Sequence, residues 1–390
     1  MQDLVETFAI CDITLTPDEI WRKVTTNFGE RAKNAGSATY KGMTRTQVYA
    51  RVQYLRRMST QKHIYNDILN PPLGLVTNSD RFFFNNQIIG IDTRAKVPPY
   101  RTESAVSWAN PALLGILKIP NIHLFVDGTF RSVPKGFSQC FIVMAYDNTT
   151  KAYVPIMYTL MTSMTEYAYT NLLHNLIVAS DYKLNPSSIT CDFEVALRNA
   201  IKDQFPGATI NGCLFHFKQA CRRYLIEKIK FNHDQIKVAM NKEEGIELLT
   251  KIPHDEIRWK GIPFVRSIIE DDLSEEEVEK WDAFWKYFDT QWMRCIAVWS
   301  LLDENGEFPD IQNRTNNPIE RYNKKMNQIF ETPHPSMKKF VTLIELEATR
   351  QVVRLDNIRH GRNGTTIEPV EINQTIPDSY IAFEPPVLNA

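Results

Sequence analysis

Residues 121–130 read NIHLFVDGTF, a run typical of a buried strand that passes directly into Asp127 and Gly128. An unpaired charge at the end of a buried strand is costly, so this carboxylate must be solvated, paired or bound to a cation. Asp127 is therefore either an ordinary residue of a strand-to-turn junction, with Gly128 supplying the turn, or one ligand of a metal-binding carboxylate cluster. The strands and helices predicted after residue 130 help to decide between these two interpretations of Asp127.

Two further strands are predicted soon after the first, FSQCFIVMAYD (137–147) and AYVPIMYTLMT (152–162). The links between the three are short and turn-like, which favours antiparallel pairing. Helices and strands then alternate over residues 165–230. The order β-β-β-α-β-α-β-α predicts an α/β protein with a ribonuclease-H-like core, whose mixed sheet has three antiparallel strands and then parallel strands joined by helices.

The other segments are expected to surround this core. We divide the chain into a basic helical N-terminal segment (1–64), a connector or small subdomain (65–118), the first part of the core (119–231), a Trp-rich helical insertion (232–310), C-terminal helices completing the core (311–360) and an extended tail (361–390). Helices are predicted to begin near Thr16 and Thr44, and a hairpin is expected in the connector from RFFFNN (81–86) and QIIGID (87–92).

Composition sets limits on the class of protein. With 390 residues, 43% of them hydrophobic, the chain is long enough for more than one core. No apolar run approaches the ~18 residues of a membrane span, and the N-terminus lacks the order of a secretory signal. Six scattered cysteines are typical of reduced thiols, so we expect an intracellular protein that is not secreted.

Net charge is only −1, yet charge is unevenly distributed along the chain. Between Arg22 and Lys62 there are ten basic residues and one acidic residue, Glu30. Two short basic helices in this segment are a candidate DNA-binding module, although a solvated helical hairpin is the simpler interpretation.

Carboxylates are expected to converge at one edge of the sheet. In the predicted strand order the ends of the first and fourth strands are neighbours, which brings Asp127 together with Asp192. Two such aspartates repel each other unless a cation lies between them, and Mg²⁺ prefers oxygen ligands of this kind. Glu320 is the candidate for a third ligand, but its position three residues after Asn317 also fits a capping box. Glu194 is either a further ligand or a residue that stabilises the start of its helix.

Cys213 and His216 form half of a zinc ligand set, and Cys221 offers a third donor. Because no fourth ligand is evident, a buried thiol and a satisfied histidine are the simpler interpretation, and zinc is not expected. Two basic patches on predicted helices are candidates for contacts with DNA phosphates, or else are solvated faces. They comprise Arg321, Lys324 and Lys325 on the helix of Glu320, and Lys218, Arg222 and Arg223 on the helix after Cys213.

Four motifs in order resemble the transposase domain of Mutator-like elements (MULEs), over roughly residues 120–360. They are DGTF (127–130), CDFE (191–194), GCLFHFKQA (212–220) and NNPIERYNKKMNQIF (316–330), the last followed by HPSMKKF (334–340). Members of this family are DDE-type cut-and-paste DNA transposases with a ribonuclease-H-like core and a helical insertion before the last acidic residue.

The resemblance implies a function and assigns roles. Asp127, Asp192 and Glu320 match the catalytic, metal-ligating acids, and Cys213 with His216 matches the family's Cys-x-x-His motif. The implied reaction is DNA cleavage at element ends and strand transfer, with Mg²⁺ as cofactor and Mn²⁺ as a substitute. DNA is then the partner, no membrane is involved, a homo-oligomer assembles on DNA, and a eukaryotic host places the protein in the nucleus.

One feature departs from the family pattern. Members commonly carry an N-terminal zinc-binding module for DNA recognition, but no Cys/His array with zinc-finger spacing precedes Asp127. Either the basic helices of residues 16–62 recognise the element ends, or the chain is a truncated or domesticated copy. The alternative function is therefore a transposase-derived DNA-binding or regulatory protein that does not cut DNA.

Overall fold

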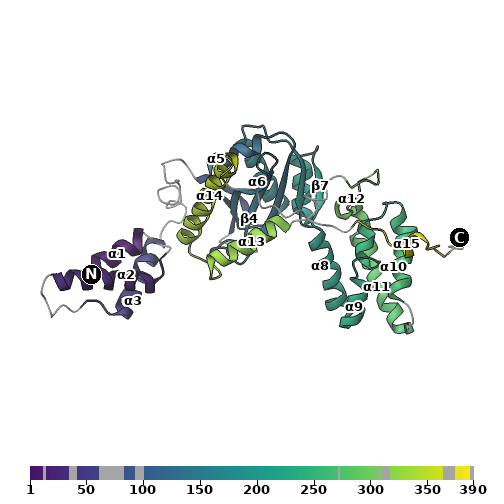
Figure 1. Ribbon diagram of the computed structural model, residues 1–390, viewed down its shortest axis with the longest axis horizontal. Coiled ribbons are helices and arrows are strands. Elements are labelled where there is room, and N and C mark those ends of the chain that lie inside the picture. The colour runs from purple at the N-terminus through teal and green to yellow at the C-terminus, as the bar shows by residue number, and fades with distance from the viewer. Residues whose placement is uncertain are drawn as a thin grey trace.

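A computed structural model describes residues 1–11, 15–34, 42–60, 83–92, 101–270, 273–303, 305–308, 317–362 and 374–386. A mixed sheet lies at the centre, with the N-terminal helices on one side and the helical insertion on the other (Figure 1). The predicted mixed α/β class is confirmed. No helix in these described ranges is both long and apolar enough to cross a membrane.

The sheet has seven strands in the order β1-β2-β5-β4-β3-β6-β7. Their bounds are Phe83–Asp92 (β1), Arg101–Ala109 (β2), Ile122–Thr129 (β3), Gln139–Asp147 (β4), Ala152–Met161 (β5), Pro186–Cys191 (β6) and Thr209–Gly212 (β7). β3 pairs antiparallel with β4 and parallel with β6, and β7 continues the parallel part. Strand β3, which contains Asp127, therefore lies where the antiparallel and parallel halves of the sheet meet.

The helices are α1 (Gln2–Cys11), α2 (Pro17–Asn34), α3 (Arg45–Thr60), α5 (Pro111–Leu114), α6 (Glu166–Ala179), α7 (Val195–Gln204), α8 (Leu214–Tyr224), α9 (His233–Ala239), α10 (Ile262–Ile269), α11 (Glu275–Gln291), α12 (Ile296–Trp299), α13 (Asn317–Phe330), α14 (Met337–Arg359) and α15 (Asp378–Ile381). Shorter helical turns lie at Gly115–Lys118, Leu225–Ile229, Ile246–Thr250, Ile257–Gly261 and Met293–Cys295. The predicted start near Thr16 is confirmed by a capping box, in which the Thr16 N–H donates to Glu19 Oε2 at 2.6 Å.

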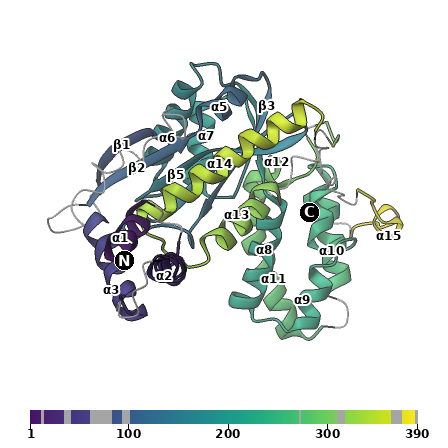
Figure 2. The same cartoon turned by 60° about the vertical axis from the view of Figure 1, so that its left-hand side comes forward.

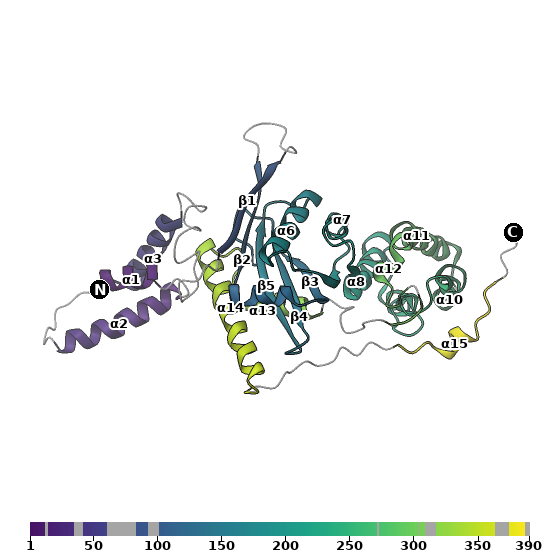
Figure 3. The ribbon, with the colours of Figure 1, turned by 90° about the horizontal axis from the view of Figure 1, so that it is seen from above.

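Register determines which side chains meet which helix. Asp127 lies opposite Ile142, and Ile142 lies opposite Tyr158, so these three side chains share one face of the sheet. Tyr158 hydrogen-bonds Tyr322 of α13, so that helix covers this face. Phe141 points to the other face, where its ring meets Tyr169 of α6 with centroids 5.4 Å apart. In Figure 3 the sheet lies between α6 with α7 and α13 with α14.

The expected connector contributes to the sheet. RFFFNN and QIIGID do not form a hairpin with each other, because residues 83–92 are one strand, β1, which pairs with β2. β2 in turn pairs with β5 and so extends the sheet. The sequence pattern did not predict β2, because polar residues interrupt its apolar residues. One of them, Ser107, is nevertheless buried, and its hydroxyl lies 2.8 Å from that of Thr159.

The helical insertion has its own apolar core. Trp281, Trp292 and Trp299 are almost fully buried in it, whereas Trp259 is 51% exposed. The tail was expected to be extended, but residues 374–386 include α15 and pack on the insertion. Tyr380 is buried there and its hydroxyl donates to Glu256 at 2.7 Å, which holds α15 against the insertion.

Candidate functional site

Two aspartates lie side by side at the carboxyl ends of the neighbouring strands β3 and β6. These strands run parallel with Phe125 opposite Thr190, so Asp127 and Asp192 follow at matching positions on neighbouring strands. Asp127 is 8% exposed, and Asp192 is intermediate in exposure. Sequence reasoning placed these two residues together for the same reason, namely the switch from antiparallel to parallel pairing.

Helix α13 adds two polar side chains to this edge. Glu320 and Asn323 are three residues apart and so project from one face of the helix. Asn323 Nδ2 donates to Asp127 Oδ2 at 2.7 Å, which ties α13 to β3. Asn323 is buried, and its Oδ1 has no hydrogen-bond partner in the described part of the chain. Sequence reasoning missed this residue, although its spacing from Glu320 was an available signal.

The electrostatics of Asp127 reflect this crowding. Burial raises the pKa of the Asp127 carboxyl to about 7, and the charges of Asp192 and Glu320 add to the rise. The Gly128 N–H and the Asn323 amide oppose it by bonding the charged form. The charges of all three predicted acids therefore influence one another, although within the described residues their ligand oxygens do not all lie within 4.8 Å of one another. A cation at this edge would relieve their repulsion.

Gly128 has a packing role and is not part of a turn. It lies within β3, opposite Phe141. A Cβ at this position would lie 2.3 Å from Gln139 Oε1, so an added side chain would force the Gln139 side chain to move. Gln139 is buried and donates to the Tyr169 hydroxyl at 2.8 Å, so its side chain is held in place. The interpretation of Asp127 as a strand-to-turn residue is therefore wrong.

The side chain of Glu194 bonds Tyr169 and does not cap α7. Its Oε2 accepts a hydrogen bond from the Tyr169 hydroxyl at 2.8 Å, and its own N–H donates to Asp192 Oδ1 at 3.0 Å. It is the N-cap residue of α7 but makes no side-chain capping bond. Burial, followed by the Asp192 charge, raises the pKa of the Glu194 carboxyl against the lowering effect of Tyr169.

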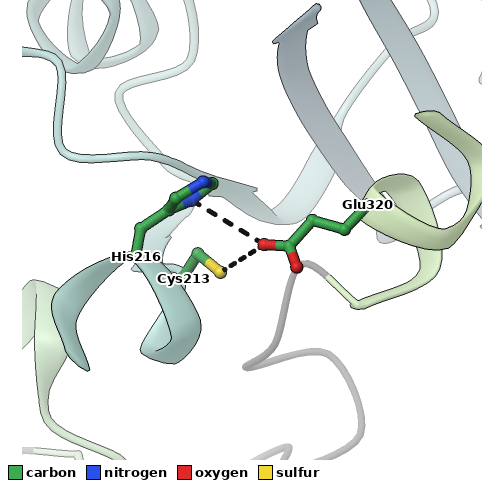
Figure 4. Close-up of side chains that lie close together, drawn as sticks. All are labelled: Cys213, His216 and Glu320. Carbon is green, nitrogen blue, oxygen red and sulfur yellow. Dashed lines mark hydrogen bonds and ion pairs between the residues drawn. The ribbon is translucent and has the colours of Figure 1, made fainter. Parts of the chain in front are cut away.

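Glu320 contacts the Cys-x-x-His motif (Figure 4). Cys213 Sγ donates to Glu320 Oε1 at 3.3 Å, and His216 Nδ1 lies 3.9 Å from the same oxygen. Cys213 precedes α8 directly after β7, and its N–H donates to Cys191 O at 2.9 Å, so the motif sits at the same sheet edge. The side chain of Asn317, which a capping box with Glu320 requires, lies outside the described residues.

A sulfur, a nitrogen and an oxygen atom from Cys213, His216 and Glu320 lie within 4.8 Å of one another. These donor types suit a divalent metal with some preference for softer ligands. Glu320 thus stands between two donor sets, the aspartates on one side and the Cys-x-x-His motif on the other. Sequence reasoning did not connect the motif to Glu320, because only the packing of α13 beside α8 brings them together.

The predicted DNA-contact residues separate into two groups. Arg321, Lys324, Arg222 and Arg223 are exposed. Lys325 Nζ lies 2.5 Å from Oε1 of the fully buried Glu347, and Lys218 is paired with Glu247. These two lysines therefore offset the charge of buried carboxylates, and Glu347 Oε1 also accepts a hydrogen bond from Gln351 Nε2 at 2.8 Å. In the N-terminal segment, Arg45 similarly pairs with Asp18 at 2.5 Å.

Comparison with known proteins gives one family. Residues 123–220 match the family model of the MULE transposase domain. The matched segment runs from β3 into α8, so it contains Asp127, Asp192 and the Cys-x-x-His motif and ends before Glu320. A search of curated proteins found no match. Over residues 123–220 this chain is thus similar to the MULE transposase domain.

Proposed function

We propose that the protein is a DDE-type DNA transposase that cleaves element ends and transfers the strands. The observation that carries this proposal is the meeting of Asp127 and Asp192 at adjacent parallel strand ends, with Glu320 close enough to raise the pKa of Asp127. Acidic oxygens that converge from distant chain positions are what metal-assisted phosphoryl transfer requires. The MULE match over residues 123–220 supports the same reaction class.

The proposed core is ribonuclease-H-like. Its strands are β3, β4 and β5, which pair antiparallel, followed by the parallel strands β6 and β7. β1 and β2 extend the sheet beyond this unit at the β5 edge. The helical region of residues 214–303 lies between β7 and α13, as expected for an insertion before the last acid (Figure 2).

The residues at this edge fit Mg²⁺, with Mn²⁺ as a substitute. Buried and half-buried carboxylates supply hard oxygen donors, and burial together with the charges of Asp192 and Glu320 raises the pKa of Asp127. Asp127, Asp192 and Glu320 would hold the metal, which when bound supplies charge stabilisation to the attacking and leaving oxygens. Zinc remains unexpected in this proposal, although Cys213 and His216 add donors that would suit it.

The chain itself orients these ligands. Asn323 binds one oxygen of Asp127 and so orients the carboxylate toward the sheet edge. Tyr169 holds the Glu194 carboxylate beside Asp192. Arg321 and Lys324 project into solvent from the helix of Glu320, where they can contact DNA phosphates. We further propose that a homo-oligomer assembles on DNA and that the protein acts in the nucleus if its host is eukaryotic.

The alternative proposal is a domesticated, transposase-derived DNA-binding or regulatory protein without cutting activity. The observation that favours it is the contact of Glu320 Oε1 with Cys213, because this oxygen is then occupied by a protein donor. The two proposals agree on DNA as partner and differ in whether Glu320 serves as a metal ligand.

A cleavage and strand-transfer assay separates them. The substrates are DNA duplexes carrying the terminal inverted repeats that flank the coding sequence, incubated with Mg²⁺ or EDTA. We expect Mg²⁺-dependent cleavage by the wild-type protein and its loss in Asp127→Asn, Asp192→Asn and Glu320→Gln. Glu345→Gln, which changes a half-buried carboxyl on α14, is the matched control and should retain activity. Activity in all three site variants would refute the site, and binding without cleavage by the wild type would favour the regulator.

A further inference from the structure

A groove of about 660 Å³ lies between α8 and α9, outside the carboxylate cluster. On one side it is lined by Phe215, Lys218 and Arg222 of α8, which recur at helical spacing and so form one stripe, and by Ile226 of the helical turn that follows. Lys237 lines it from α9. The volume is within the range of sites that hold a small organic group. The groove combines apolar and cationic surface along its length.

Its charge is positive and partly uncompensated. Lys218 is paired with Glu247, so its charge is balanced locally. Arg222 and Lys237 make no ion pair with the residues that the structure describes, and no acidic side chain from those residues lines the groove. An anionic ligand is therefore favoured. Because Phe215 is 48% exposed and Ile226 is 45% exposed, that ligand should also present an apolar surface.

The groove begins at the candidate metal edge. Phe215 and His216 are adjacent on the first turn of α8, and their rings meet edge to face with centroids 5.8 Å apart. His216 Nδ1 lies 3.9 Å from Glu320 Oε1. A polymer that reached the carboxylates could therefore continue along α8 over Phe215 and on to Arg222. Figure 2 shows α8 leading from the sheet edge toward α9.

We propose that this groove binds unpaired nucleotides of a single DNA strand, with a base stacked on Phe215 and phosphates beside Arg222 and Lys237. Nucleic acid is the ligand that combines repeated negative charge with flat apolar groups. The proposal rests on the proposed function for the presence of DNA at this edge. The competing ligand is an acidic amphipathic peptide, which would also match a groove of basic and apolar side chains. Continuity with the carboxylate edge favours DNA.

Binding without metal tests the groove independently of cleavage. The probe is a fluorescent ten-nucleotide dT strand, measured by anisotropy with the full chain in EDTA across a series of salt concentrations. Each phosphate contact on a single strand contributes about 0.7 to the slope of log affinity against log salt. We expect the double variant Arg222→Gln/Lys237→Gln to reduce that slope by about 1.4, twice the single-contact value. The matched control Lys228→Gln, an exposed cation on the same helical segment that does not line the groove, should change it by less than half as much.

The aromatic contact is tested by Phe215→Ala and Phe215→Leu. Loss of one base–aromatic stack weakens binding roughly 5- to 150-fold with the salt slope unchanged. Trp259→Ala removes a comparably exposed aromatic outside the groove and should leave affinity within twofold. Phe215→Leu keeps apolar volume, so it separates stacking from any loss of folding.

Three results would overturn the proposal: an unchanged salt slope in the double variant, equal or tighter binding of a duplex of the same length, and displacement of the strand by an acidic amphipathic peptide that binds more tightly. Failure of the cleavage assay with intact groove binding would reject only the catalytic proposal.

Discussion

Replacing Asp127 with asparagine should make the metal-free protein more stable at neutral pH. Asp127 is 8% exposed, and burial together with Asp192 and Glu320 raises its pKa to about 7 from 3.8. A carboxyl that binds its proton more tightly in the folded state stabilises the fold below pH ~4 and loses that contribution as pH rises toward 7. The amide introduced by Asp127→Asn carries no charge at any pH, and its oxygen can still accept a hydrogen bond from Asn323.

The size of the effect follows from the two pKa values. At about 1.36 kcal/mol per pH unit, a rise from 3.8 to about 7 corresponds to about 4 kcal/mol of lost stability at pH 8. We therefore expect Asp127→Asn to exceed the wild type in free energy of unfolding by up to about 4 kcal/mol at pH 8 and to match it near pH 4. A divalent cation at 100 times its Kd should restore about 2.7 kcal/mol to the wild type alone.

The assay is urea denaturation followed by tryptophan fluorescence, in EDTA and in Mg²⁺, at pH 4 to 8. The difference between variant and wild type cancels the titration of groups that do not interact with Asp127. Burial also raises the pKa of Glu345 to about 7, so Glu345→Gln serves as a control that should keep the full Mg²⁺ response. The reasoning is refuted if Asp127→Asn is no more stable at pH 8, or if it gains as much from Mg²⁺ as the wild type.

Three further substitutions test other contacts. Asn323→Ala should weaken Mg²⁺ binding by roughly 10- to 100-fold in calorimetry, because it removes the donor that orients Asp127, and unchanged affinity would contradict this. Gly128→Ala should cost about 1–3 kcal/mol in denaturation, since the new Cβ meets Gln139 Oε1, and Gln139→Ser in the same chain should relieve it. Lys325→Met should destabilise the fold by about 1–3 kcal/mol through Glu347 while leaving the salt slope of DNA binding unchanged; a lower slope would instead make Lys325 a phosphate contact.

Sequence patterns predicted the central part of the fold because its strands, links and helices are each recognisable from short stretches of sequence. The apolar run before Asp127, the short links to the next two strands and the later helix–strand alternation are enough to predict a mixed sheet with Asp127 and Asp192 as neighbours. β2 escaped prediction because Ser104 and Ser107 break the apolar pattern. Their burial becomes favourable only through hydrogen bonds to distant residues, Thr162 for Ser104 and Thr159 for Ser107.

The rest of the site depends on tertiary packing. Asn323 reaches Asp127 only because α13 packs against β3, and the sequence of α13 does not predict which strand it packs against. The contact between Cys213 and Glu320 joins residues 107 positions apart in the chain. Lys218 and Lys325 looked like DNA contacts because their acidic partners, Glu247 and Glu347, are likewise distant in sequence. Spacing along a helix identifies a basic face but not what covers it.

The most direct test of the central claim is the position of Mn²⁺ in crystals of the full chain, located by anomalous diffraction. The account predicts a peak bound by Asp127 and Asp192 at the shared edge of β3 and β6, and its loss in Asp127→Asn. A peak held only by Cys213, His216 and Glu320, with none at the aspartates, would contradict a carboxylate site for phosphoryl transfer.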